Sequence, residues 1–232
     1  MSSCDVNLAD RDARQRDLVP PARLARCHAV VIGVGSVGRQ VALQLAATGV
    51  PAMTLYDPDT VAVENLAVQG FWETDIGDPK VHAVANVCHS QLPMMELYPR
   101  HERFKKSASR GWPTQRDHVI FCCVDSIATR KLVWEAVRTT ASFFADGRMS
   151  AEVIRVLASD RPATDATYPK TLFGAGEAFA GSCTAKSTIY AASVAAGLMV
   201  GQFARWLRNL RVTPDQTLNL LASELSVSDP VD

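Results

Sequence analysis

The sequence predicts an α/β fold in which helices flank a mostly parallel sheet, and three observations support this prediction. Apolar runs of strand length alternate with segments of helical period over the first two thirds of the chain. Residues 30–50, VVIGVGSVGRQVALQLAATGV, lead from a strand through a glycine turn into a helix. Three apolar runs end in aspartates, Asp57, Asp125 and Asp146. Because ligands of such Rossmann-like sheets bind at the carboxyl ends of the strands, these aspartates mark a candidate binding edge.

Elements of the first half follow from the apolar period and from the residues that break it. The helix after the turn stops at Gly49, because glycine commonly ends helices. In chain order we expect a strand into the turn, a helix over 36–47, a strand over 52–57, a long loop over 58–79, a helix over 80–90 and a strand over 94–98.

The second half continues the alternation and then loses it. Prolines and glycines between residues 159 and 181 interrupt any period, which predicts a mobile crossover segment over about 159–183. In order we expect a strand over 118–125, a helix over 127–139, strands over 142–146 and 152–158, the crossover, a helix over 184–210 and one C-terminal edge strand over 216–227.

Composition limits the classes of protein. The chain has 232 residues, 47% of them hydrophobic, which suits one sizeable α/β domain. Its 24 basic side chains balance 24 acidic ones, which argues against electrostatic binding to nucleic acid or to a membrane surface. The apolar stretch 189–203 is too short to span a bilayer, and residues 1–17 lack the apolar run of a secretory signal. We therefore expect a cytoplasmic protein.

Cysteine spacing excludes two further readings. No pair has C-x-x-C spacing, so neither a disulfide framework nor a structural zinc site is expected. The six cysteines are Cys4, Cys27, Cys88, Cys122, Cys123 and Cys183.

The glycine turn predicts a phosphate site. Gly33, Gly35 and Gly38 have G-x-G-x-x-G spacing at the start of a helix, where backbone amides bind anions. Asp57 follows about twenty residues later, where a carboxylate can accept hydrogen bonds from ribose hydroxyls. This pattern fits NAD and ATP equally. A turn without ligand, and aspartates that only cap helices, are the structural alternatives.

The loop after Asp57 distinguishes these possibilities. Residues 57–80, DPDTVAVENLAVQGFWETDIGDPK, resemble the D-x-D-x-V-x-x-x-N-L-x-x-Q...D-x-G-x-x-K segment of the ThiF/MoeB/HesA family, which includes the ubiquitin-activating enzymes. RDARQRDL at 11–18 resembles the opening R-x-x-R-Q element of that family, and FCCVDSIATR at 121–130 resembles its strand that ends in a magnesium-binding aspartate. The matching positions of the loop are Asp57, Asp59, Val61, Asn65, Leu66, Gln69, Asp75, Gly77 and Lys80.

The resemblance implies adenylation of a C-terminal carboxylate by ATP, with release of pyrophosphate. Such a carboxylate is already ionised at neutral pH, so the step needs charge neutralisation and in-line positioning more than a general base. The implied roles are phosphate binding at Gly33, Gly35, Ser36 and Gly38, nucleotide contacts at Asp57, Asp59, Asn65 and Gln69, stabilisation of developing charge at Lys80, and Mg²⁺ binding at Asp125.

The resemblance also suggests roles for two arginines and one cysteine outside the loop. By family analogy Arg14 reaches ATP in a neighbouring protomer, which implies a homodimer. The family commonly has an arginine where this chain has Val68, and Arg130 is a candidate for the missing charge. Cys183 precedes a helix whose dipole would lower the pKa of its thiol, so it is a candidate for thioester or sulfur transfer. A small apolar filler is the alternative at Cys183.

The resulting hypothesis is an enzyme dependent on ATP and Mg²⁺, without zinc, that acts on a ubiquitin-like or sulfur-carrier protein ending in glycine. Residues 1–28 form a helical arm that contributes to the dimer, and residues 29–232 form one adenylation domain. Peptides and a modified transfer-RNA base are other acceptors within the family. An NAD-dependent oxidoreductase and a catalytically idle nucleotide-binding protein are the competing classes.

Overall fold

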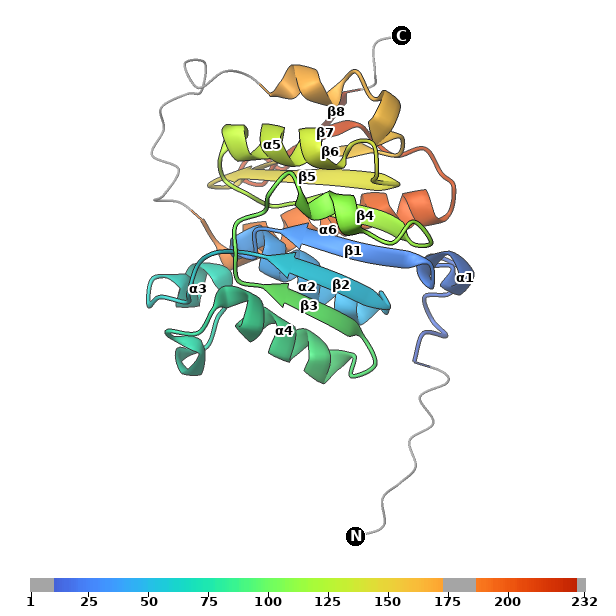
Figure 1. Cartoon of the computed structure of the whole chain (residues 1–232). Helices are drawn as coiled ribbons and strands as arrows, with labels where there is room; N and C mark the ends of the chain where they lie inside the picture. Colours follow the sequence, from blue (N-terminus) through green and yellow to red (C-terminus); the bar gives the residue numbers. More distant parts are fainter. Residues whose placement is uncertain (1–10, 173–186, 229–232) are drawn as a thin grey trace.

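The computed structural model describes residues 11–172 and 187–228 and confirms the α/β class (Figure 1). Its strands form one eight-stranded sheet in the order β3-β2-β1-β4-β5-β6-β7-β8. The strands are β1 (Cys27–Ile32), β2 (Ala52–Tyr56), β3 (Glu96–Arg100), β4 (Asp117–Cys122), β5 (Phe143–Ser150), β6 (Val153–Ser159), β7 (Asp215–Asn219) and β8 (Glu224–Ser228). The helices are α1 (Pro21–Leu24), α2 (Ser36–Thr48), α3 (Asn65–Gln69), α4 (Lys80–Gln91), α5 (Ile127–Val137) and α6 (Ile189–Leu207), with 3-10 helices η2 (Glu73–Asp75), η3 (Ala108–Gly111), η4 (Pro162–Thr164) and η5 (Tyr168–Thr171).

The sheet is parallel over its first five strands in chain order and antiparallel beyond them. β1 pairs in parallel with β2 and β4, and the same direction continues to β3 and β5. β6, β7 and β8 then follow as antiparallel neighbours. The carboxyl ends of β1, β2 and β4 therefore meet at one edge, where the predicted site residues gather.

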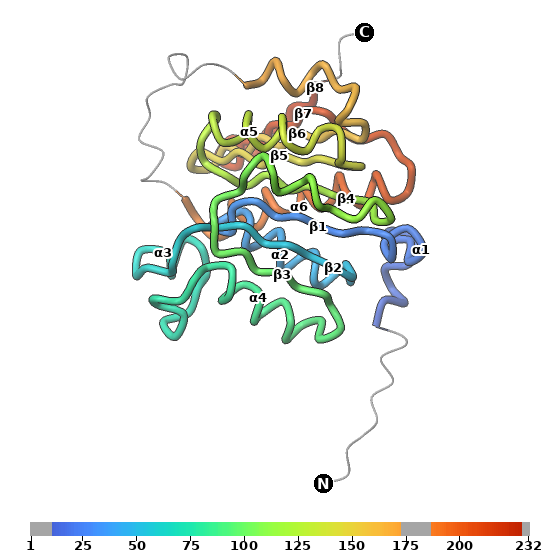
Figure 2. Tube along the Cα trace, viewed as in Figure 1, coloured from blue at the N-terminus to red at the C-terminus, as the bar shows by residue number. Residues whose placement is uncertain are grey.

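Helices cover both faces of the sheet. Figures 1 and 2 show α2, α4 and α6 on one face and α5 on the other. Adjacent residues of β5 point to opposite faces, as strand geometry requires. Phe143 contacts Phe203 of α6 with ring centroids 5.8 Å apart, whereas Phe144 meets Trp134 of α5 at 5.0 Å. Two separate hydrophobic cores result, one beneath each helical layer.

Two glycines allow α2 to approach the end of β1. Gly33 has φ +85°, a left-handed conformation that glycine adopts without strain. A Cβ on Gly38 would lie 1.8 Å from the Gly33 carbonyl oxygen. Only a residue without a side chain therefore fits at this crossing.

The arm before β1 packs against the other end of α2. Nη2 of Arg11 donates to the carbonyl oxygens of Ala46 and Ala47, both at 3.0 Å, and Nε2 of Gln15 donates to that of Thr48 at 3.0 Å. These bonds satisfy carbonyls that the last turn of a helix leaves without partners. The described part of the arm consists of turns followed by the four-residue α1, and its part in a dimer stays a prediction.

The C-terminal prediction was wrong in one respect. A single edge strand was expected over 216–227, but the structure has a hairpin of β7 and β8. A turn that includes Ser223, at φ +57°, reverses the chain between them. The expected strand at 142–146 is also longer, since β5 runs on to Ser150. Of the predicted crossover, residues 160–172 include η4 and η5, and 173–183 lie outside the described residues.

The crossing of α2 over β1 generates a stability prediction. Gly38→Ala should destabilise the fold by about 3 kcal/mol, because the new methyl group must displace backbone. Urea denaturation measures this change in the free energy of unfolding. Gly201→Ala is the matched control: this exposed glycine of α6 has open space around its Cβ position, so alanine should stabilise the helix by about 0.5–1 kcal/mol. Equal effects of the two substitutions would contradict the packing account.

Candidate functional site

The glycine turn leaves the first amides of α2 without a side-chain cap. Gly35 is the N-cap residue of α2, and no side chain of the described residues caps that end. A Cβ on Gly35 would meet only the Gln69 side chain, at 3.7 Å or more. Packing therefore does not require glycine at this position. Uncapped amides beside a residue with open space are what a phosphate group needs in order to approach.

Asp57 fixes the shape of this turn. Its Oδ2 accepts from the Val34 amide at 2.8 Å, and its Oδ1 accepts from the Asp59 amide at 2.9 Å. Burial raises the pKa of the Asp57 carboxyl, while these two amides and the nearby Lys80 act in the opposite direction. The side chain thus links the end of β2 to the turn after β1. Its contact with ribose stays a prediction.

Lys80 begins α4 and turns its amine towards Asp59. The Lys80 Nζ lies 3.2 Å from Asp59 Oδ2, and the lysine side chain is 8% exposed against 61% for the aspartate. A lysine in the first turn of a helix is unfavourably placed for the helix dipole, so another interaction must compensate. Asp59 provides that interaction, and because its carboxylate is exposed, solvent or a ligand can reach the pair.

The short helix α3 brings two amide side chains to the site. Asn65 stabilises the loop, because its Oδ1 accepts from the Ala62 amide at 3.0 Å. Gln69 lies against Gly35, and none of the described residues bonds to its buried Oε1. A buried amide oxygen without a partner is energetically unfavourable, which marks Gln69 as a side chain available to a ligand.

Ser36 and Asp125 complete the edge. The Ser36 hydroxyl accepts from the Ser187 hydroxyl at 3.0 Å, which ties the segment before α6 to the start of α2. Asp125 is exposed between β4 and α5, and the described residues offer its carboxylate no partner. Ser126, not Asp125, caps α5, since its hydroxyl accepts from the Thr129 amide at 3.3 Å. Asp125 therefore does not cap α5 in this structure.

Sequence reasoning missed Arg39, which lies one turn after Gly35 on the same side of α2. The residue is 6% exposed, yet no hydrogen bond or ion pair reaches its guanidinium from the described residues. Arg39 stacks over Phe71 with 5.3 Å between guanidinium carbon and ring centroid, and burial lowers its pKa. Its i+4 spacing from Gly35 within the motif was the available signal.

Arg130 lies beside the binding edge, but protein groups occupy its guanidinium. Its guanidinium pairs with Asp146 and donates to the carbonyl oxygens of Val124 and Gly147. Asp146 was expected on the rim with Asp57 and Asp125, and the strand register places it level with that rim, opposite Cys122 at the end of β4. It is nevertheless fully buried, and β5 continues beyond it to Ser150. Oδ2 of Asp146 also accepts from Arg148 Nε at 2.8 Å and from the Tyr168 hydroxyl at 3.1 Å. These charges pair with one another, so a contact of Arg130 with a triphosphate would require the network to rearrange, and it stays a prediction.

Two predicted residues lie elsewhere. Arg14 is exposed in the arm, which packs at the carboxyl end of α2 and therefore away from the glycine turn of its own chain. Cys183 lies outside the described residues, so its reactivity stays a prediction.

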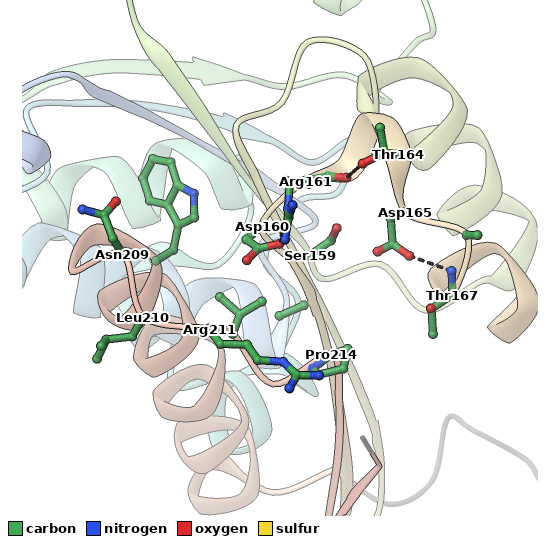
Figure 3. A pocket seen from close by; sticks show the side chains of 14 residues that line it. Ser159, Asp160, Arg161, Thr164, Asp165, Thr167, Asn209, Leu210, Arg211 and Pro214 are labelled. Carbon is green, nitrogen blue, oxygen red and sulfur yellow. Dashed lines mark hydrogen bonds and ion pairs between the residues drawn. The ribbon is translucent and has the colours of Figure 1, made fainter. Parts of the chain in front are cut away.

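A cavity of about 750 Å³ lies at the opposite edge of the sheet (Figure 3). Asp160, Arg161, Asp165 and Arg211 line it near the end of α6, whereas the start of α6 lies near the glycine turn. Since α6 spans 19 residues, or about 28 Å, the cavity is separate from the site.

Residues 11–172 and 187–228 contain no cluster of three or more His, Cys, Asp or Glu side chains that could hold a metal ion. Nor does that part of the chain contain a helix with the length and apolar character needed to cross a bilayer.

The fold and the glycine turn define a nucleotide-binding α/β domain of Rossmann-like type. Residues 12–226 match the model of the ThiF family, and the chain belongs to that family.

Curated relatives are distant. The sulfur carrier protein ThiS adenylyltransferase of Escherichia coli (strain K12) is 31% identical over 110 residues, which cover 47% of this chain and 43% of that protein. Adenylyltransferase and sulfurtransferase MOCS3 of Mus musculus is 35% identical over 119 residues, which cover 49% and 25%. The chain thus spans less than half the length of these relatives.

Solved structures show the same fold over nearly the whole chain. The structure of PaaA superposes with a TM-score of 0.75 and 17% identity, covering 99% of this chain and 76% of PaaA. E. coli MccB in complex with ATP superposes with a TM-score of 0.69 and 14% identity, covering 98% and 72%. At these identities the comparison establishes the architecture alone.

The buried charge network generates a second prediction. Asp146→Asn should lower the free energy of unfolding by about 3–5 kcal/mol, because it leaves Arg130 buried without its counter-ion. Chemical denaturation measures the change. Glu96→Gln, which removes an exposed ion pair with Arg116, should change it by less than about 1 kcal/mol. A loss at Asp146 as small as that at Glu96 would show that the network does not stabilise the fold.

Proposed function

We propose that this chain activates a C-terminal carboxylate by adenylation with ATP, and that the acceptor is a ubiquitin-like or sulfur-carrier protein ending in glycine. Family membership supports the reaction class, since its relatives include a ThiS adenylyltransferase and a MOCS3 adenylyltransferase. MccB, which has the same fold, has been solved with ATP and with MccA. The acceptor of this chain is inferred from these relatives and from this structure.

One observation carries the proposal: the uncapped amides of α2 face the unpartnered Gln69 carboxamide across Gly35. The described residues leave both sides unsatisfied. A phosphate group supplies the acceptors that the amides lack, and a ribose hydroxyl can donate to the Gln69 Oε1. The neighbouring Lys80 adds a positive charge that the pyrophosphate of a dinucleotide does not require. A hydride-transfer enzyme would leave Lys80 and Asp125 without a function.

The chemistry follows from these groups. The α2 amides bind phosphate oxygens. The Lys80 amine, paired with Asp59 in the free chain, interacts with the phosphate oxygens on which negative charge develops. A carboxylate oxygen of the acceptor attacks the α-phosphorus of ATP, and the bond to the bridging oxygen breaks. The products are an acyl-adenylate and pyrophosphate, and no proton has to be removed from the nucleophile.

Asp125 is the candidate ligand for Mg²⁺. Its exposed carboxylate has no partner in the described residues, and Mg²⁺ in such sites takes one or two carboxylates together with phosphate oxygens. When bound, the ion neutralises charge on the phosphate groups.

The arm supports a role for a second copy of the chain. Arg11 and Gln15 fix the arm at the far end of α2, so the exposed Arg14 can contact a nucleotide only in a neighbouring protomer. A homodimer with Arg14 acting across the interface is therefore part of the proposal. Residues 1–28 as dimer arm and 29–232 as adenylation domain complete it. Transfer of the activated carrier to Cys183, with release of AMP, is a further step that the family resemblance suggests.

Exchange of labelled pyrophosphate into ATP tests the proposal. The wild-type chain with Mg²⁺ and a small protein ending in Gly-Gly from its own cell should support exchange, and chelation of Mg²⁺ should abolish it. Lys80→Met should reduce exchange by about 100- to 1000-fold, because it removes a charge that stabilises the transition state. The variant should fold, since its partner Asp59 stays exposed to water.

Arg116→Met is the control, because Arg116 pairs with Glu96 at the amino ends of β4 and β3, the edge of the sheet opposite the glycine turn. Its exchange rate should equal that of the wild type. Binding of NADH in preference to ATP, or exchange that survives in Lys80→Met, would contradict the proposed function.

A further inference from the structure

Arg39 and Arg130 are the two arginines that rank among the buried residues of the described chain, and their surroundings differ. They are 6% and 4% exposed. The guanidinium of Arg130 is paired with Asp146 and with two carbonyl oxygens. That of Arg39 has neither an ion pair nor a hydrogen bond within the described residues, and its Nε is completely buried. The Asp75 carboxylate acts on this charge without forming an ion pair with it. A buried cation without a paired counter-ion destabilises a fold, so packing alone gives no reason for an arginine here.

The position of Arg39 relates it to the glycine turn. A Cβ on Gly70 would lie 3.1 Å from Nη1 of Arg39, so the guanidinium lies against the end of α3. The preceding residue, Gln69, faces Gly35. Arg39 and Gln69 therefore occupy adjacent positions beside the uncapped end of α2. Within the described residues, the Arg39 Nε and the Gln69 Oε1 both lack a hydrogen-bond partner, as do the side-chain-uncapped amides of α2 nearby.

We propose that Arg39 is a nucleotide-binding residue that contacts the pyrophosphate part of ATP. This inference rests on the proposed function and adds to it a binding residue for the nucleotide. The α2 amides bind one phosphate at the turn. The guanidinium of Arg39 extends from the first turn of α2 to the end of α3 and binds the adjacent phosphates. Planar guanidinium groups bind phosphate oxygens in pairs, which suits a group whose donors are all unused.

The placement also accounts for Val68. The resemblance places an arginine at that position of α3, but α3 in this chain carries no cation. Arg39 belongs to α2, and its guanidinium lies against the end of α3 and stacks over Phe71. The positive charge is thus supplied from a different element and at a more buried position.

Arg39→Met tests the inference through two measurements on the full chain. Isothermal titration with ATP should give an affinity about 10- to 100-fold weaker than that of the wild type, whereas AMP should bind within about 2-fold. Without nucleotide, the melting temperature of Arg39→Met should equal or exceed that of the wild type, because an unpaired buried charge is removed. Arg39→Lys should recover part of the ATP affinity.

Arg130→Met is the matched control, because it removes an equally buried arginine whose partners are protein groups. It should lower the melting temperature without nucleotide. If Arg39→Met lowers it as much, or if ATP and AMP lose affinity equally, Arg39 is structural and the inference is overturned. If the wild type binds ATP and Arg39→Met binds it equally well, the inference alone fails. If the wild type binds no ATP, the proposed function fails and the inference with it.

Discussion

The close contact between the start of α2 and the end of β1 is the constraint on which the rest of the site depends. Gly38 lies so near the Gly33 carbonyl that no side chain fits between them. The contact aims the first amides of α2 at the sheet edge where β1, β2 and β4 end. Asp57 then locks the turn through the Val34 amide. The positions of Gln69, Lys80 and Asp125 have meaning only relative to this fixed turn.

Charges in this protein divide into two groups by their partners. Asp146, Arg130 and Arg148 satisfy one another in the interior, where they join β5 to α5 and to the segment that includes Tyr168. Lys80 pairs with an exposed carboxylate, whereas Arg39 forms no ion pair in the described chain and the Asp75 carboxylate acts on it only from a distance. The first group stabilises the fold. The second group leaves positive charge at the glycine turn for an anionic ligand, at some expense of stability.

Much of the fold was predictable from the sequence, because helical and strand periods are local properties. The helix after the glycine turn was expected over 36–47 and spans Ser36–Thr48. The burial of Asp146 at the rim was not predictable, since β5 continues beyond the aspartate to pair with β6. The pairing of Arg130 with Asp146 was missed for the same reason. Arg39 was missed because burial of an arginine cannot be seen in a helical pattern. Loop residues such as Lys80 and Asp59 were found through their motif, but their pairing required the structure.

A crystal structure with Mg²⁺ and a non-hydrolysable ATP analogue tests the central claim most directly. The account predicts phosphate oxygens on the amides at the start of α2, with the amine of Lys80 and the guanidinium of Arg39 within hydrogen-bond distance of them and the ion on Asp125. A nucleotide bound at the opposite edge, in the cavity lined by Arg161 and Arg211, would contradict it. So would a triphosphate at the turn that leaves Lys80 paired only with Asp59.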